Sequence, residues 1–277
     1  MLKKNIRLAV FLFAIIYACI LSASFFFQRN MMYFPPIGLP PLEEAAAQGY
    51  EIVQVKTEDG LTLKTLYKAP ESPNKNPKGA ILVFHGNGSS ALYERHRTDF
   101  FNSLGLAVML GEYRGYSHNE GKPTESGLIK DAQAQYEALM ARGFKPENIY
   151  LYGHSLGTAV SLALAENKKV GGIILETPFL SALTLAHGAI HFMPDFLINI
   201  IMRDNYRSDE RITKIDAPFL FLIAGKDTIV PNESSEALYN LARGKKEKAF
   251  FPTANHVNIW DFDVHTPIRK FMEDITQ

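Results

Sequence analysis

Gly153-His154-Ser155-Leu156-Gly157 is the stretch of sequence that decides the fold. It follows the apolar run 149–152 and precedes the small-residue, helix-compatible stretch 158–166. A G-x-S-x-G motif between a strand and a helix forms a sharp turn that holds the serine hydroxyl above the edge of a sheet. Both glycines are needed because a side chain at either position would collide with the neighbouring strand or helix. The pattern predicts that Ser155 is a nucleophile.

Strand and helix signals alternate along the chain on both sides of this turn. The segment 50–68 has the pattern of a hairpin with its turn at Asp59-Gly60. Further strands are expected at 79–85, 106–110, 149–152, 170–175, 218–224 and 248–251, and helices at 92–104, 124–142 and 259–275. This alternation indicates an α/β fold over 49–277, with a mostly parallel central sheet and helices on both faces. Right-handed crossovers then bring the catalytic loops to the carboxyl ends of the strands.

Partners for the serine follow in the order that this motif requires. A serine hydroxyl is a weak nucleophile at neutral pH and needs an adjacent base. Enzymes with this turn place an acid and then a histidine downstream of the serine. Asp227 directly follows the expected strand 218–224, and His256 lies in the loop after the last strand. We expect His256 to take and return the proton of Ser155, and Asp227 to orient the imidazole.

Two backbone N–H groups are expected to bind the oxyanion. Leu156 opens the helix after the serine, and Asn87 lies in the glycine-rich loop 85–88 that follows an earlier strand. This loop lacks the spacing and the lysine of a phosphate-binding loop, so no cofactor is expected. His187 and His191 have helical spacing but lack the glutamate of H-E-x-x-H, so no metal site is expected either.

An apolar segment lies near the N-terminus. Leu8–Phe27 contains 20 residues without a charge. As a helix it spans about 30 Å, which is the thickness of a bilayer core. Basic residues precede it, which favours a cytoplasmic N-terminus and an extracytoplasmic main domain, periplasmic if the protein is bacterial: Lys3, Lys4 and Arg7. We therefore expect a membrane anchor over 1–27 and a proline-containing connector over 28–48.

Two other interpretations of the N-terminal segment stay open. Ser22-Ala23-Ser24 is a candidate cleavage site of a signal peptide, and Cys19 is a candidate lipoprotein site. Cys19 is the single cysteine of the chain, so no disulfide forms within it. The formal net charge is zero and no basic stripe is present, which excludes a nucleic-acid partner.

The region 179–207 interrupts the alternation and is more apolar than a connector needs to be. One interpretation is that its helices pack on the core. The other is a small helical lid that lines an acyl pocket or dips into lipid. The candidate lining residues are Phe179, Leu180, Phe192, Met193 and Phe196.

Several motifs together carry a resemblance to a known family. They are His85-Gly86-Asn87-Gly88, Tyr113-Arg114-Gly115-Tyr116-Ser117, Gly121-Lys122-Pro123, the serine turn, Glu176-Thr177-Pro178-Phe179 and Gly225-x-x-Asp227-x-x-Val230-Pro231. The set resembles the membrane-anchored α/β-hydrolases of the Bem46-like group. The resemblance implies an α/β-hydrolase fold and a serine hydrolase; members of the group remove long acyl chains from proteins or act on lysophospholipids. Glu112 departs from the pattern, since relatives often have aspartate there, and we expect its loop to be structural.

These observations predict a membrane-tethered serine hydrolase. The expected reaction is cleavage of carboxylic esters or thioesters of lipid-like acyl groups through an acyl-enzyme. The expected partners are a small-molecule or lipid acyl substrate, an acylated protein, and a membrane through residues 8–27. An aminopeptidase-like serine peptidase and a non-catalytic membrane scaffold are the alternatives. Acyl length, head group and oligomeric state stay open.

Overall fold

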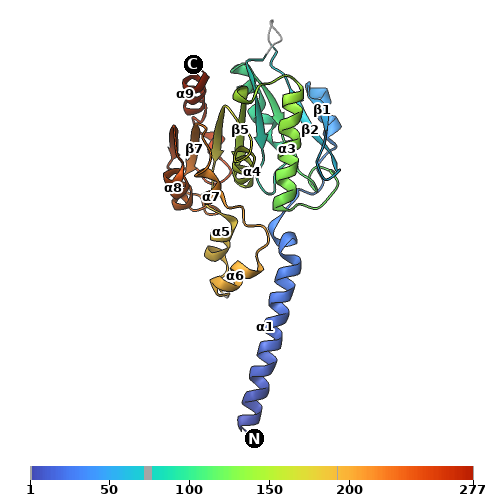
Figure 1. Cartoon of the computed structure of the whole chain (residues 1–277), viewed down its shortest axis with the longest axis vertical. Helices are drawn as coiled ribbons and strands as arrows, with labels where there is room; N and C mark the ends of the chain where they lie inside the picture. Colours follow the sequence, from blue (N-terminus) through green and yellow to red (C-terminus); the bar gives the residue numbers. More distant parts are fainter. Residues whose placement is uncertain (1, 72–76, 192, 277) are drawn as a thin grey trace.

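The computed structural model describes residues 2–71, 77–191 and 193–276 (Figure 1). Eight strands lie within these residues: β1 (Glu51–Lys56), β2 (Thr62–Lys68), β3 (Gly79–Phe84), β4 (Leu106–Leu110), β5 (Ile149–His154), β6 (Gly172–Glu176), β7 (Phe219–Ala224) and β8 (Lys246–Phe251). β1 and β2 form the expected antiparallel hairpin, and Gly60 has a φ of 91° in its turn. The strand positions agree with the sequence to within a few residues.

The eight strands form one sheet in the order β1-β2-β4-β3-β5-β6-β7-β8. β2 pairs antiparallel with β4, and the neighbours from β4 to β8 are parallel. Every residue of β3, β4, β6 and β7 is buried. Continuous burial is what a parallel sheet covered on both faces requires. The predicted α/β fold is therefore confirmed.

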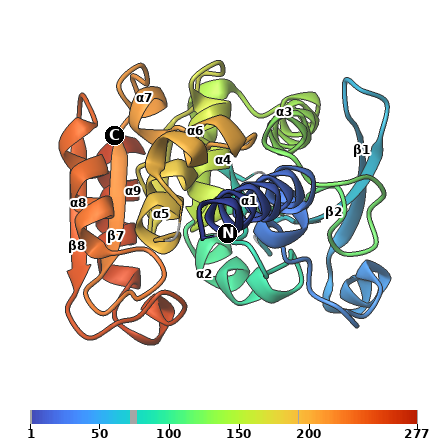
Figure 2. The same ribbon diagram turned by 90° about the horizontal axis from the view of Figure 1, so that it is seen from below.

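Helices cover both faces of this sheet (Figures 1 and 2). One face carries α3 (Glu125–Ala141), α4 (Leu156–Ala165), α7 (Ser208–Ile212) and α8 (Asn232–Leu241). The other face carries α2 (Thr98–Ser103) and α9 (His265–Thr276). Thr124 caps α3 by accepting a hydrogen bond from Gly127 N at 2.9 Å, as its position in the sequence suggests.

The single helix expected over 92–104 is divided in the structure. A 3₁₀-helix, η2 (Tyr93–Arg97), precedes α2. A 3₁₀-helix has three residues per turn, so residues i and i+3 lie directly above each other. This places Glu94 and Arg97 on one face, where both are buried and paired with each other. Arg97 also pairs with Glu176 of β6, so contacts with a distant strand help to hold this tighter turn.

The C-terminal helix begins later than expected. A 3₁₀ turn, η4 (Ile259–Asp261), comes first, and α9 starts at His265 instead of residue 259. The Asp263 carboxylate accepts a hydrogen bond from Thr266 N at 3.1 Å and so caps the first turn. The sequence holds this signal, because Asp263 is a favoured capping residue and Pro267, the third residue of α9, is tolerated in the first turn of a helix.

The N-terminal helix α1 (Leu2–Met32) projects from the domain along the long axis of the molecule (Figure 1). Among the described residues it is the one helix long and apolar enough to cross a membrane. Residues 28–32, expected in the connector, continue this helix. Farther along the connector, the 3₁₀-helix η1 (Leu42–Gln48) buries Leu42 and Ala45.

The region 179–207 forms a small cap. It contains α5 (Ala182–Ala189) and α6 (Asp195–Ile201), which lie below the sheet and beside α1 (Figures 1 and 2). α1 and α6 are in direct contact. The cap and the end of α1 therefore lie side by side at the carboxyl edge of the sheet.

Candidate active site

Ser155 lies at the apex of the turn between β5 and α4. Its backbone has φ 51° and ψ −114°, a strained conformation for a residue with a side chain. A Cβ on Gly157 would lie 2.0 Å from the Phe84 carbonyl oxygen, and one on Gly153 would lie 2.4 Å from the Gly157 carbonyl oxygen. Only glycine fits at either position, which accounts for the G-x-S-x-G pattern in atomic terms.

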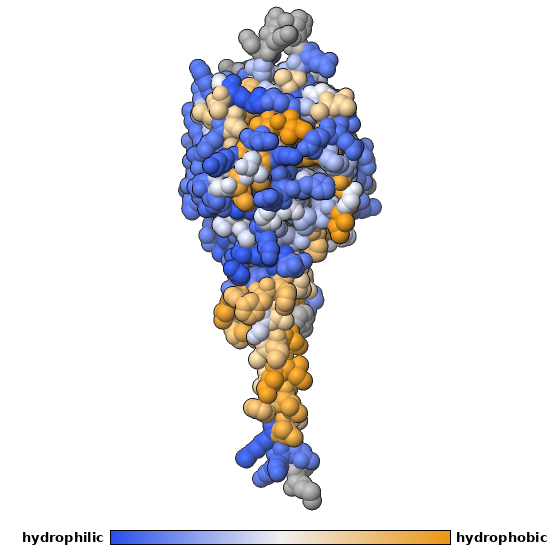
Figure 3. Space-filling view, turned by 90° about the vertical axis from the view of Figure 1, so that its right-hand side faces the viewer, coloured by the Kyte–Doolittle hydropathy of each residue, from blue (hydrophilic) through white to orange (hydrophobic). Residues whose placement is uncertain are grey.

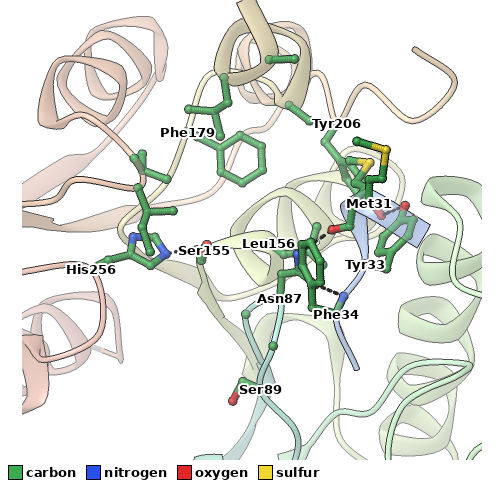
Figure 4. Close-up of a pocket in the computed structure, with 18 of the residues that line it drawn as sticks. Met31, Tyr33, Phe34, Asn87, Ser89, Ser155, Leu156, Phe179, Tyr206 and His256 are labelled. Carbon is green, nitrogen blue, oxygen red and sulfur yellow. Dashed lines mark hydrogen bonds between the residues drawn. The ribbon is translucent and has the colours of Figure 1, made fainter. Parts of the chain in front are cut away.

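The structure brings Ser155, His256 and Asp227 together, and Figure 4 shows the contact between Ser155 and His256. His256 Nε2 lies 2.9 Å from Ser155 Oγ, and His256 Nδ1 lies 2.7 Å from Asp227 Oδ2. The other carboxylate oxygen of Asp227 accepts hydrogen bonds from Ile229 N and Val230 N at 2.9 and 2.8 Å. The carboxylate is thus fixed by its own loop while it orients the imidazole. This geometry allows a proton to pass from the serine hydroxyl to His256.

The two backbone N–H groups expected to bind an oxyanion lie beside the nucleophile. Leu156 is the first residue of α4, so its N–H has no partner within the helix. Within the described part of the chain, neither Leu156 N nor Asn87 N donates a hydrogen bond. The preceding residue, Gly86, passes so close that a Cβ on it would lie 3.4 Å from Ser155 Cβ. Both N–H groups are therefore available as hydrogen-bond donors close to the serine turn.

The side chain of Asn87 connects this loop to the end of α1. Its Nδ2 donates to Met32 O at 2.6 Å, and its Oδ1 accepts from Phe34 N at 2.9 Å (Figure 4). The Tyr116 hydroxyl donates to the same oxygen at 2.9 Å. These contacts were not predicted, because the sequence suggested a role only for the backbone of Asn87. Because Met32 and Phe34 lie far from Asn87 in the sequence, no local pattern indicates these contacts.

Glu112 supports the same loop from the interior. Its Oε1 lies 2.6 Å from His85 Nε2, and its Oε2 accepts from Ala91 N at 3.0 Å. Both side chains of the His85–Glu112 pair are completely buried. Burial tends to lower the pKa of His85, but the carboxylate outweighs burial and raises that pKa above its usual value. Glu112 therefore holds the ends of the 85–91 loop, in agreement with a structural role.

A second buried network lies behind the nucleophile. Arg97 donates to Glu176 Oε2 at 2.7 Å, and the Tyr152 hydroxyl donates to the same carboxylate. Burial opposes ionisation of Glu176, yet Arg97 outweighs it and lowers its pKa to about 2. The carbonyl oxygen of Glu176 accepts a hydrogen bond from Ser155 N at 2.9 Å. The network thus fixes the strand end on which the serine turn rests.

His154 positions the base. Its Nε2 lies 3.1 Å from the carbonyl oxygen of His256, and the centroids of the two rings are 5.5 Å apart. The residue between the first glycine and the nucleophile therefore contacts the loop that carries the imidazole. This contact agrees with a packing role within the motif.

A cavity of about 880 Å³ extends from Ser155 and His256 toward the cap and α1. Its volume is near the upper end of the usual range for ligand sites. Near the nucleophile it is bordered by polar groups: Ser89, Glu94, Arg97 and His154. Toward the cap its walls are mainly apolar: Met31, Met32, Leu185, Ile190, Ile198, Ile201 and Met202.

The candidate lid residues occupy different places. Phe179 and Met193 are buried and line the cavity, as expected. Leu180 packs against the hydrophobic core instead, and Phe196 is 62% exposed on the outer surface of α6. The expected lining needs correction at these two positions, because the turn before α5 and the short α6 direct them away. Phe192 lies outside the described residues.

The lining of the cavity by α1 was also missed. Ser24, Gln28 and Met31 of this helix face the cavity. A weak signal exists in the sequence, since Ser24 and Gln28 are polar residues four positions apart in an apolar context. Residues with this spacing lie on one face of a helix.

Comparisons with known proteins agree with the fold and the motifs. Residues 75–207 match the family model described as serine aminopeptidase, S33. An uncharacterized Mycobacterium tuberculosis protein is 35% identical over 230 residues, which cover 83% of this chain and 80% of that protein. The Schizosaccharomyces pombe protein Bem46 is 31% identical over 247 residues, with 83% and 80% covered.

Two further comparisons are informative. The lysophosphatidylserine lipase ABHD12 of Danio rerio is 33% identical over 184 residues, which cover 60% of this chain and 48% of that protein. The structure of the Pyrococcus furiosus esterase Pf2001 superposes with a TM-score of 0.69 at 21% identity, covering 88% of this chain and 97% of that one. The latter similarity concerns the fold alone. Taken with the relatives above, these findings show that the chain belongs to the Bem46-like α/β-hydrolases.

Proposed function

We propose that this protein is a membrane-tethered serine hydrolase that cleaves carboxylic esters or thioesters of long acyl groups. One observation carries the proposal: the hydrogen-bonded series Ser155–His256–Asp227 opens into a cavity with mainly apolar walls. A hydroxyl activated in this way attacks a carbonyl carbon, and the apolar walls accommodate a hydrocarbon chain.

The proposed reaction proceeds in two halves. His256 accepts the proton of Ser155 while Oγ attacks the acyl carbon, and Asp227 stabilises the imidazolium. The N–H groups of Leu156 and Asn87 bind the oxyanion. His256 then gives the proton to the leaving alcohol or thiol, which leaves an acyl-Ser155 intermediate. Water attacks this ester with the same assistance and releases the carboxylic acid.

The membrane tether in this proposal is α1. Its uncharged run, residues 8–27, is long enough to cross a bilayer core as a helix of about 30 Å. The basic residues before this run favour a cytoplasmic N-terminus and an extracytoplasmic hydrolase domain. The name of one relative, a lysophosphatidylserine lipase, supports an acyl substrate.

The first test of the proposed function is the variant Ser155→Ala. Turnover of p-nitrophenyl esters of increasing acyl length is measured for both proteins in detergent. We expect the variant to lose at least about 10⁴-fold in kcat, since removing a member of a catalytic triad commonly has this effect. A fluorophosphonate probe should label the wild-type protein and not the variant. Equal turnover by the two proteins would refute the proposal.

A peptidase is the alternative that the family description favours, because the matching model is that of a serine aminopeptidase. The same triad cleaves amides. Aminoacyl-p-nitroanilides distinguish the two: turnover of these amides above that of the matched acyl esters would assign the peptidase activity. A non-catalytic scaffold would show neither turnover nor labelling by the probe.

A further inference from the structure

One face of α1 belongs to the wall of the cavity. Leu21, Ser24, Gln28 and Met32 are half-buried and follow one another at spacings of three or four residues. By contrast, Phe26 and Phe27 are 71% and 62% exposed. A stripe with this spacing is the face that a helix packs against its neighbour. The membrane-proximal part of α1 is therefore packed against the domain along this stripe.

Hydrogen bonds fix the position of the cap along the axis of α1. Gln28 Nε2 donates to Ile201 O at 2.8 Å, and Gln28 Oε1 accepts from Arg203 N at 2.8 Å. The Arg29 guanidinium forms two hydrogen bonds with the Asp204 carboxylate, at 2.8 and 2.9 Å. The carboxyl end of α6 thus lies level with residue 28, directly after the uncharged run 8–27. In a bilayer that α1 crosses over residues 8–27, as proposed above, this end of α6 lies at the surface.

The outer surface of α6 carries two large exposed apolar side chains. Phe196 and Ile200, one helical turn apart, are 62% and 71% exposed, whereas Ile198 between them is buried against the cavity. Figure 3 shows apolar surface continuing from α1 onto the neck where the helix enters the domain. Exposed apolar surface that adjoins a membrane helix is suited to the headgroup and acyl boundary of a bilayer.

We propose that the cavity opens toward the bilayer between α1 and α6, and that the acyl chain of a membrane lipid enters it laterally. This inference rests on the proposed hydrolase activity. Ser24 is the cavity-lining residue of α1 nearest the middle of the uncharged run, so it marks the entrance. An acyl chain that enters there lies along α1 and the apolar cap, and its carbonyl reaches Ser155 at the other end. The anchor is then part of the substrate site.

Two serines on α1 provide a matched test of the entrance. Ser24 faces the cavity, whereas Ser22 is exposed on another face of the helix. The full-length variants Ser24→Trp and Ser22→Trp are reconstituted in phosphatidylcholine vesicles. Hydrolysis of a long-chain lysophospholipid in the vesicle is compared with that of p-nitrophenyl acetate. We expect Ser24→Trp to lower the ratio of long-chain to short-chain turnover at least tenfold, and Ser22→Trp to match the wild type.

The position of α6 is tested by fluorescence. Phe196→Trp and the control Leu241→Trp, in α8, are reconstituted with brominated lipids, and the emission of the native Trp260 is subtracted. We expect strong quenching of Trp emission for the α6 variant and little for the control. Equal quenching, or equal turnover ratios for the two serine variants, would overturn the lateral entrance. Failure of the wild type to hydrolyse any ester would instead overturn the proposed function, and the quenching still reports where α6 lies.

Discussion

Ser155 shows how a local pattern predicts a site. The strained backbone at the serine and the lack of space at Gly153 and Gly157 are local properties. They can therefore be recognised in five consecutive residues. The order of Asp227 and His256 along the chain then follows from the topology of the sheet. The residues that hold the site in place form no such local motif. Asn87 is the clearest case, because its partners at the end of α1, Met32 and Phe34, lie more than 50 positions away in the sequence.

The hydrogen bonds of Asn87 lead to a prediction about the rate. Asn87→Ala removes the side chain that ties the oxyanion loop to Met32 and Phe34. Loss of an oxyanion donor itself costs about 10²–10³ in kcat. Because the loop is loosened here and the N–H is kept, we expect about a tenfold lower kcat for p-nitrophenyl acetate. KM should change little, since the oxyanion forms only in the transition state.

Tyr116→Phe is the matched control for this prediction. It removes one of the hydrogen bonds to Asn87 Oδ1 and leaves those to the end of α1 in place. We expect a smaller decrease in kcat than for Asn87→Ala. A rise in KM at constant kcat in the alanine variant would contradict the positioning role, because it would indicate a contact with substrate in the ground state.

At the scale of the elements, the buried network between η2 and β6 gives a prediction about pH. Arg97 lowers the pKa of Glu176 from its ordinary 4.5 to about 2. A carboxyl with a lower pKa in the folded state stabilises the protein above its unfolded pKa, and this contribution is lost as the pH falls through the folded pKa. The stabilisation is therefore complete above about pH 5 and disappears toward pH 2.

Glu176→Gln tests this contribution. The shift in pKa corresponds to about 3 kcal/mol, within the usual cost of breaking a buried ion pair. We expect the free energy of unfolding in urea to fall by about this amount at pH 7, with the difference from wild type narrowing from pH 4.5 downward. Glu137→Gln is the control, because its ion pair with Lys168 is exposed and contributes little. A difference independent of pH would show that Glu176 acts through packing alone.

Periodicity predicted the central elements better than the connecting ones. Buried strands such as β3 and β7 are continuous apolar runs that can be recognised without their neighbours. The segment 92–97 also has a helical composition, but its geometry is set by a partner, Glu176, that lies 79 positions away from Arg97. Tertiary contacts of this kind override local propensity. The late start of α9 was predictable from Asp263 and Pro267.

At the scale of the whole molecule, the boundary between anchor and domain is less sharp than the sequence suggested. The absence of charge over residues 8–27 predicts the membrane segment. The first proline pair, at 35–36, sets the limit beyond which the helix cannot continue. The helix uses the residues between these limits to bind the domain. Gln28 and Arg29 contact the end of α6 and Asp204, and Tyr33 donates to Asp204 at 3.1 Å. The sequence contains these polar residues, but it does not reveal their partners.

Two truncations distinguish the role of the anchor, residues 1–27, from that of the residues at the end of α1 that contact the domain. Removal of residues 1–27 keeps Arg29 and Tyr33, so we expect turnover of p-nitrophenyl acetate in detergent close to that of the full chain. Removal of residues 1–34 leaves the buried carboxylate of Asp204 without either partner. Breaking a buried ion pair costs about 3–5 kcal/mol, and we expect the lower end because the Arg29 side chain is 30% exposed. Urea unfolding and ester turnover of the two truncated proteins check this; equal stability would show that the helix end is not part of the domain.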